Sequence, residues 1–382
     1  MEKGNVLVIG NSGVGKSTLI NAVLGESLAE TSCGAEGTTK ELKIYENSEL
    51  PFRLIDTAGF EPSWLKEFQA IQAVKKWSKE SAAGKKNDKR INAIWFCVDG
   101  TSRKLFGKTI SNLSAATRMW ESVPVIVVIT KSYSVPERNE NIEMVQEAFA
   151  RQKTAKNLKA IIPLVAATYV LNDAAYAAPE GVTQLIDQTN GILPEGMQAA
   201  EQDIYRYKLK RKNIMAQSVI GTATTAGVIV GAVPIPFADA VILTPTEVVE
   251  VNALGVVYEI GKDEKSKRFI NSIIEVGTVG AAAKASISAI KAIPGINIAA
   301  AALNAVIAGV FVAIIGETSK YLFEQVYTGK RTLEDIDWAQ KILESKLTNE
   351  ALEKVNKLLG SVSDKTDVKE ITELVKKLLT GS

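Results

Sequence analysis

The chain has 382 residues, of which 45 are Lys or Arg and 43 are Asp or Glu, so its formal net charge is only +2. This length predicts two or three domains with a real core, and the balanced charge excludes binding to nucleic acid through a strong overall field. We therefore expect no nucleic-acid partner. Two cysteines, Cys33 and Cys97, without any histidine, exclude a disulfide framework, a Cys/His zinc site and histidine-dependent hydrolase chemistry.

Short apolar runs alternate with longer polar, helix-like stretches over about the first 200 residues. This alternation is typical of an α/β domain with a mixed, mostly parallel sheet and helices on both faces. Most of the runs are continuously apolar, as burial on both faces of a strand requires. The six expected strands cover residues 6–9, 42–45, 52–55, 93–98, 125–129 and 161–165.

A glycine-rich segment at residues 10–17, Gly-Asn-Ser-Gly-Val-Gly-Lys-Ser, fits G-x-x-x-x-G-K-[ST] between a predicted strand and a predicted helix. The spacing predicts a loop whose backbone N–H groups wrap phosphates, helped by the positive end of the helix. Lys16 is expected to reach the β and γ phosphate oxygens, and the Ser17 hydroxyl to bind Mg²⁺. The expected nucleotide-binding residues in this segment are Asn11, Ser12, Gly13, Val14, Gly15, Lys16, Ser17 and Thr18.

Two further segments extend the expected phosphate site. The sequence Asp-Thr-Ala-Gly at 56–59 follows a predicted strand, where a carboxylate can hold a Mg²⁺-bound water and a glycine N–H can meet the γ-phosphate. The polar segment at 34–39 ends in two threonines, whose hydroxyls suit closing over Mg²⁺ when a γ-phosphate is present.

These three segments, in this order, resemble the Era/TrmE-type branch of the P-loop GTPases, and the likeness covers residues 4 to about 195. The resemblance implies GTP and GDP as nucleotides and Mg²⁺ held by Ser17, by Thr39 or Thr38, and through a water by Asp56. It implies that Lys16, Thr39 and Gly59 act at the reacting phosphate. It also implies two switches, at 26–40 and at 57 to about 90.

Two departures from the family pattern concern hydrolysis. Phe60 stands where Ras-like enzymes have the glutamine that orients water, and Gly13 replaces the asparagine with which the TrmE group holds potassium. We therefore expect slow intrinsic hydrolysis that is accelerated by a homodimer through the GTPase domain or by a partner. A pseudo-GTPase scaffold that holds GTP with negligible turnover stays open as an alternative.

Another departure concerns the base. Thr130 and Lys131 fit the guanine-reading pattern Asn/Thr-Lys-x-Asp, but Tyr133 stands where the carboxylate would accept both guanine N–H groups. Ala166 lies where the family places its last base-contacting loop. Guanine specificity is thus implied more by the resemblance than by the residues, and an ATPase is a further alternative.

The second half of the chain predicts an all-helical domain over 201–382, after the GTPase domain over 1–200. Segments 213–238 and 292–316 carry no charge and are long enough to cross a bilayer, but amides, threonines and prolines weaken the first. Buried helices of a soluble or peripheral bundle are the alternative. The basic stretch at 205–212 predicts either a solvated helix face or a site for anionic lipids.

Residues 233–239 and 248–261 resemble a helical domain of unknown function that is appended to bacterial Era-like GTPases. The architecture is more distantly similar to immunity-related and dynamin-like GTPases. Since residues 6–10 are too short for a signal-peptide core, we expect a cytoplasmic protein, peripheral or integral at the inner face of a membrane if it binds one. The expected function is a Mg²⁺-dependent GTPase switch that repositions the helical domain and acts on a membrane or protein partner.

Overall fold

The structure is a computed structural model, and it describes residues 3–25, 29–32, 43–56, 90–102, 122–151, 157–172, 175–233, 244–261, 263–279, 288, 290, 299–363 and 366–380. The chain divides into two compact units. The first unit comprises Met1–Ala167 with Pro179–Arg211, and the second comprises Thr168–Ala178 with Lys212–Ser382. The domain boundary expected at residue 200 stays a prediction, because a division by contacts does not show that either unit folds alone.

A seven-stranded sheet forms the framework of the first unit, in the order β2-β3-β4-β1-β5-β6-β7. The central strand β1 pairs in parallel with both β4 and β5, while β2 and β3 run antiparallel at one edge. The strands are β1 (Gly4–Ile9), β2 (Ala29–Ser32), β3 (Lys43–Glu46), β4 (Phe52–Asp56), β5 (Ile91–Asp99), β6 (Val125–Thr130) and β7 (Leu158–Pro163). The mostly parallel α/β sheet is confirmed, but it has one strand more than the six predicted, because the short polar β2 has no apolar run that could reveal it.

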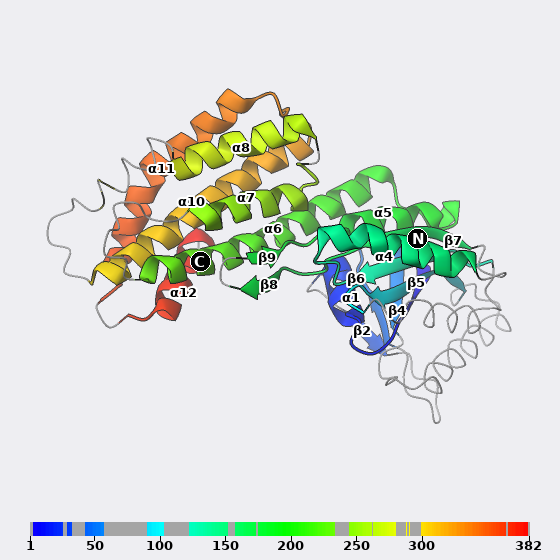
Figure 1. Cartoon of the computed structure of the whole chain (residues 1–382). Coiled ribbons are helices and arrows are strands. Elements are labelled where there is room, and N and C mark those ends of the chain that lie inside the picture. Colours follow the sequence, from blue (N-terminus) through cyan, green and yellow to red (C-terminus); the bar gives the residue numbers. More distant parts are fainter. Residues whose placement is uncertain are drawn as a thin grey trace. The chain divides into compact units, whose positions relative to one another are not determined.

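Helices cover both faces of this sheet (Figure 1). On one face, Leu7 of β1 belongs to an apolar cluster that includes Phe149. On the other face, the Trp95 indole N–H donates to Thr189 Oγ1 at 3.0 Å. The helices of this unit are α1 (Lys16–Leu24), α4 (Val135–Ala150), which carries Phe149, and α5 (Val182–Ile192), which carries Thr189, together with the 3-10 helix η4 (Glu195–Met197). Central strands such as β1 and β6 are buried on both faces, so the core holds in place the residues at which the following loops begin.

The second unit is built from helices and one small hairpin (Figure 1). The described part of the chain after residue 200 is helical, as predicted, but the unit also takes in the β8–β9 hairpin from the earlier part of the chain. Its elements are β8 (Tyr169–Asn172), β9 (Ala175–Ala177), the later part of α6 (Glu201–Ala232), α7 (Thr244–Val257), α8 (Glu264–Val279), α10 (Ala300–Tyr327), α11 (Ile336–Leu359) and α12 (Val368–Thr380).

The two long helices α6 and α10 pack closely through small residues. A Cβ added at Gly231 would lie 2.7 Å from the backbone oxygen of Asn304 and 2.7 Å from the Ala308 Cβ. Among the described residues these two helices are also long and apolar enough to span a membrane, yet 56% and 67% of their most apolar windows are already buried in protein. Such burial is what the core helices of a soluble bundle show, so length and composition alone are weak evidence for spanning.

Candidate functional site

The loop between β1 and α1 takes the shape that its glycines permit. Gly13 and Gly15 have φ values of 79° and 95°, in the left-handed region that side chains with a Cβ disfavour. A Cβ at Gly10 would lie 2.6 Å from the backbone oxygen of Cys97, so the loop needs glycine there to pass β5 closely. Ser12 and Gly13 at the tip are exposed. The loop is therefore a tight, accessible turn that leads into the amino end of a helix.

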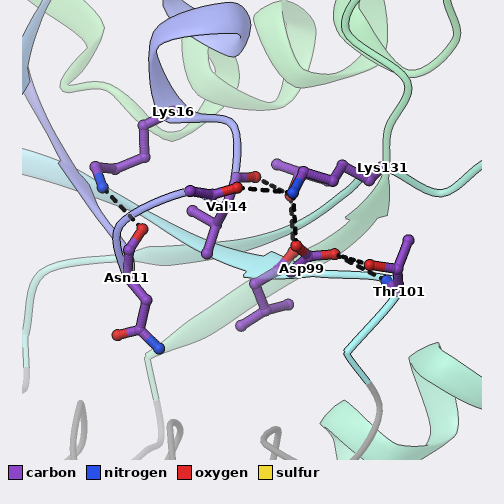
Figure 2. A network of polar contacts seen from close by, with 9 residues as sticks. Asn11, Val14, Lys16, Asp99, Thr101 and Lys131 are labelled. Atoms are coloured by element: carbon purple, nitrogen blue, oxygen red, sulfur yellow. Dashed lines mark hydrogen bonds and ion pairs between the residues drawn. The ribbon is translucent and has the colours of Figure 1, made fainter. Parts of the chain in front are cut away.

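Lys16 folds back along this loop (Figure 2). Its Nζ donates to the backbone oxygen of Gly10 at 2.7 Å and to that of Asn11 at 3.1 Å. The ammonium thus lies against the loop's own backbone, beside the first turn of α1. Positive charge from the side chain and from the helix amino terminus is concentrated at one place, which is suited to a phosphate chain.

Two of the expected metal ligands lie on elements adjacent in the fold. Ser17 and Thr18 are exposed on the first turn of α1, and Asp56 is a buried residue at the end of β4. The pairing of β4 with β1 places Asp56 opposite Val8, just before the loop begins. A hydroxyl and a carboxylate are oxygen ligands of the type that Mg²⁺ prefers. The remaining predicted residues of this set, Thr38, Thr39, Gly59 and Phe60, lie outside the described residues.

The end of β6 is tied to the same loop. Thr130 Oγ1 lies 2.5 Å from the backbone oxygen of Val14 and 3.0 Å from that of Val98. Lys131, with φ of 53°, reaches across and donates to the Gly13 backbone oxygen at 2.7 Å. The structure therefore brings both residues of the predicted base-reading pattern against the phosphate loop.

Asp99, at the end of β5, completes this connection and was missed from the sequence. Its Oδ2 forms a 2.7 Å ion pair with Lys131, and its Oδ1 accepts from the backbone N and the hydroxyl of Thr101 at 2.9 and 2.6 Å (Figure 2). Burial acts to raise the pKa of Asp99, but the hydrogen bonds from Lys131 and Thr101 outweigh it and lower that pKa. The only signal in the sequence was its position directly after an apolar strand.

The loops after β6 and β7 lie side by side. The Ser132 N–H donates to the backbone oxygen of Leu164 at 3.2 Å, and Tyr133 closes a tight turn through its N–H to the Lys131 backbone oxygen at 2.8 Å. Both Tyr133 and Ala166 are half-buried at this edge of the sheet. Ala166 follows the segment that contacts Ser132, and Tyr133 stands at the fourth position of the predicted base-reading pattern, where the carboxylate is missing.

Cys97 is a core residue of β5 beneath the loop. It is fully buried, and desolvation, only partly offset by the charge of Lys16, raises the pKa of its thiol to about 12. The thiol stays neutral at physiological pH, so Cys97 behaves as the small apolar side chain that the sequence predicts.

The basic stretch at 205–212 is a solvated helix face only in part: Arg206 and Lys210 are exposed, as one of the two expectations has it, but other members are buried. The Arg211 Nε donates to the backbone oxygen of Ala22, at the end of α1, at 2.9 Å, and the Tyr207 hydroxyl to that of Val23 at 2.7 Å. Lys212 is buried and donates to the Val257 backbone oxygen at 2.7 Å within the second unit. Tyr207, Arg211 and Lys212 are thus structural residues, since their polar groups bind backbone oxygens and are shielded from solvent or lipid.

Comparison with known proteins gives the family of the first unit. Residues 5–131 match the family model "50S ribosome-binding GTPase". The chain is 32% identical to GTPase Era of Geobacter sp. (strain M21) over 200 residues, which cover 50% of this chain and 56% of that protein. It is 30% identical to Cell division control protein 10 of Saccharomyces cerevisiae, with 38% of this chain and 52% of that protein covered. The chain thus spans about half the length of these curated relatives.

Solved structures give no further argument. A GDP-bound NFeoB mutant of S. thermophilus is 13% identical, covers 90% of this chain and 97% of its own length, and superposes with a TM-score of only 0.32. Three observations agree with one another: the matches in sequence, the glycine-rich loop before α1 and the mostly parallel sheet. The amino-terminal part of the chain is therefore a P-loop GTPase domain that is similar to the GTPases of the Era and Der type.

Proposed function

We propose that the protein is a Mg²⁺-dependent switch that binds and hydrolyses GTP and that transmits its nucleotide state to the helical second unit. The observation that carries this proposal is the arrangement of Lys16, Thr130 and Lys131 around one loop. Backbone N–H groups of the loop would bind the β-phosphate, and the Lys16 ammonium would neutralise the phosphate chain.

The residues present suit a magnesium ion. Ser17 would bind it directly and Asp56 through a water, with Thr39 or Thr38 as the further ligand. Mg²⁺ held by these residues would supply positive charge that stabilises the negative charge of the phosphate chain during hydrolysis. The Gly59 N–H would then meet the γ-phosphate, so that loss of this phosphate releases both switches.

Base recognition would fall on the loops after β6 and β7. Lys131, held by Asp99, would lie along the base and ribose side of the loop, with Ala166 supplying a backbone N–H. Because Tyr133 has no carboxylate, selection of guanine over adenine would rest on the remaining groups and would be weaker than in GTPases with the complete pattern.

Transmission to the second unit would use the chain between them. Tyr207 and Arg211 bind the last carbonyls of α1, the helix that begins at the phosphate loop, and the next residue, Lys212, is bound within the second unit. A shift of α1 would therefore reach α6 directly. The two units would then be the nucleotide domain and the effector domain, the latter acting on a membrane or on a protein.

A scaffold that binds GTP with negligible turnover is the second candidate, and Phe60 in place of a water-orienting glutamine is the residue that favours it. Single-turnover phosphate release, with enzyme in excess over GTP or ATP, separates the candidates. We expect slow release from GTP, none from Lys16→Ala, and unchanged release from Lys159→Ala, which removes an exposed lysine of β7. GTP bound without any phosphate release would instead support the scaffold, and faster release from ATP would contradict both.

A further inference from the structure

Arg138 of α4 connects the two loops to which the proposed function assigns the base. Its Nε donates to the backbone oxygen of Ser132 at 2.9 Å, in the loop after β6. Its Nη1 forms a 2.5 Å ion pair with Oε2 of Glu180, in the chain that leads into α5. One side chain therefore joins the predicted base-reading pattern to a segment that lies far from it in the sequence.

Glu180 is in turn fixed to the loop after β7. Its backbone N–H donates to the Val165 oxygen at 2.9 Å, and its backbone oxygen accepts from the Val165 N–H at 3.0 Å. Val165 directly precedes Ala166, the residue that is expected to contact the base through its backbone. The ion pair thus acts on this loop through the backbone of Glu180.

The glycine after Glu180 permits this close approach. Gly181 has a φ of 82°, in the left-handed region, and a Cβ there would lie 2.5 Å from the backbone oxygen of Pro163. A larger residue at 181 would push the segment away from the end of β7. Backbone pairing, close packing and the ion pair therefore all hold Glu180 at this place.

Ser132 is held through both of its backbone groups. Its N–H donates to the Leu164 oxygen at 3.2 Å, and its own oxygen accepts from Arg138. Ser132 stands between Lys131 and Tyr133, so these two bonds fix the positions from which both neighbouring side chains start.

The same face of α4 supports a third loop. Asn141, three residues after Arg138 and thus on the same side of the helix, donates through Nδ2 to the Gly100 oxygen at 3.1 Å. The Gly100 N–H donates to the Thr130 oxygen at 2.8 Å. One face of α4 therefore supports the loops after β5, β6 and β7.

The Arg138–Glu180 ion pair is well shielded from solvent. Its side chains are 16% and 25% exposed, whereas those of the Glu147–Arg151 pair on the same helix are 68% and 77% exposed. Charge-assisted hydrogen bonds are stronger than neutral ones, and a planar guanidinium can hold two acceptors in a fixed geometry. Arg138 holds Ser132 and Glu180 in this way.

The missing carboxylate gives this geometry a role in nucleotide binding. With Tyr133 in place of the acid, the base would be bound by Lys131 from one loop and by the Ala166 N–H from the other. Contacts from two loops act together only while the loops keep their separation, and a shift of about 1 Å is enough to weaken them.

We propose that Arg138 and Glu180 are positioning residues of the base site. Their ion pair sets the separation of the loops after β6 and β7, and so determines how much the base adds to the affinity for the nucleotide. This inference rests on the proposed function, since it requires that a nucleotide base lies between these loops. Neither side chain has to touch the nucleotide.

Calorimetric titration of the nucleotide-free full chain with GDP and with inorganic pyrophosphate, both in excess Mg²⁺, tests the proposal. Both ligands carry a diphosphate, so the ratio of their affinities measures what the guanosine adds. Arg138→Gln and Glu180→Gln are each expected to weaken GDP binding about tenfold, or about 1.4 kcal/mol, and to leave pyrophosphate binding unchanged. The double variant should lose no more than Arg138→Gln alone, because the two side chains act as one pair.

Two further variants complete the test. Arg151→Gln makes the same replacement at an exposed position of the same helical segment, and it should bind both ligands like the wild type. Arg138→Lys keeps the charge but lacks the planar fork, so its GDP affinity should fall between those of the wild type and Arg138→Gln. It also takes the place of Arg138→Gln if that variant fails to fold.

The possible results distinguish this inference from the proposed function. If Arg138→Gln weakens the binding of both ligands equally, or of neither, the positioning role is overturned while the proposed function stands. The same holds if the wild type binds pyrophosphate as tightly as GDP, since the base then adds nothing. A wild type that binds neither ligand would contradict the proposed function itself, and this inference with it.

Discussion

Asp99 shows how a single residue can connect several segments of the candidate site. It pairs with Lys131, which in turn binds the Gly13 backbone oxygen, so three segments far apart in the sequence are joined at one point. The phosphate loop and the Thr130-Lys131 pair could be predicted because each forms part of a spaced pattern. Asp99 could not, because a lone acid after an apolar strand has no pattern, and its role depends on the parallel pairing of β5 with β6.

The replacement Asp99→Asn should lower the free energy of unfolding by about 1 to 2 kcal/mol at pH 7, since it removes a charge-assisted hydrogen bond that is partly buried. Nucleotide affinity should fall as well, because Lys131 loses its anchor. Glu147→Gln is the matched control, because it breaks an ion pair with Arg151 that is exposed to solvent. The side chains of Glu147 and Arg151 are 68% and 77% exposed, so this replacement should change the free energy of unfolding by less than about 1 kcal/mol. Urea unfolding measures the stability of both variants, and calorimetric titration with GTP measures their nucleotide affinity.

The pH dependence of this effect has a defined sign. The pKa of Asp99 is lowered in the folded state, so its stabilising contribution is present above the unfolded pKa of about 3.9 and is lost as the pH falls through the folded value. The difference between wild type and Asp99→Asn should therefore be constant from pH 5 to 7 and should shrink below about pH 4. A difference that grows in acid would contradict the ion pair.

At the scale of elements, most strands that the sequence predicted are central strands with continuous apolar runs, whereas β3, expected at 42–45, was predicted although only one of its residues is buried. The edge strand β2 and the β8–β9 hairpin could not be predicted from the sequence. The residues of β2 are mostly polar and those of β8 are exposed, so neither element has the long apolar run that marks a buried strand. The burial of Glu247 and Glu250 could not be predicted from the sequence either. Acids in a helical segment usually indicate a solvated face, and only the packing of α7 against α10 shows that these two are buried.

The close packing of α6 on α10 predicts opposite outcomes for two glycines of the same helix. Gly231→Ala would push a methyl group into the backbone of α10 and should destabilise the protein by about 1 to 3 kcal/mol. Gly221→Ala meets nothing within 4 Å and should stabilise it by up to about 1 kcal/mol through helix propensity. Chemical unfolding of both variants provides the comparison, and destabilisation of equal size by the two would exclude a tight contact at Gly231.

For the whole molecule, the candidate nucleotide site lies in one unit and two buried glutamates lie in the other, and each unit has buried apolar residues of its own. The chain passes from the first to the second within α6, between Arg211 and Lys212, and both side chains are fixed by backbone oxygens of their own units. Composition alone suggested a basic, solvated stretch at this point. Arg211 and Lys212 are instead buried there, and in the proposed switch a change at α1 would reach the helical unit through them.

The central claim is that the loop before α1, together with Lys16, holds a nucleoside triphosphate, and calorimetric titration of the full chain with GTP in excess Mg²⁺ tests it most directly. We predict one GTP per chain for the wild type and for Lys159→Ala. Affinity should be about 10- to 100-fold weaker for Lys16→Ala, as expected for the loss of one or two charge-assisted contacts to phosphate. Absence of binding to GTP and ATP by the wild type, or equal affinity of wild type and Lys16→Ala, would contradict the account.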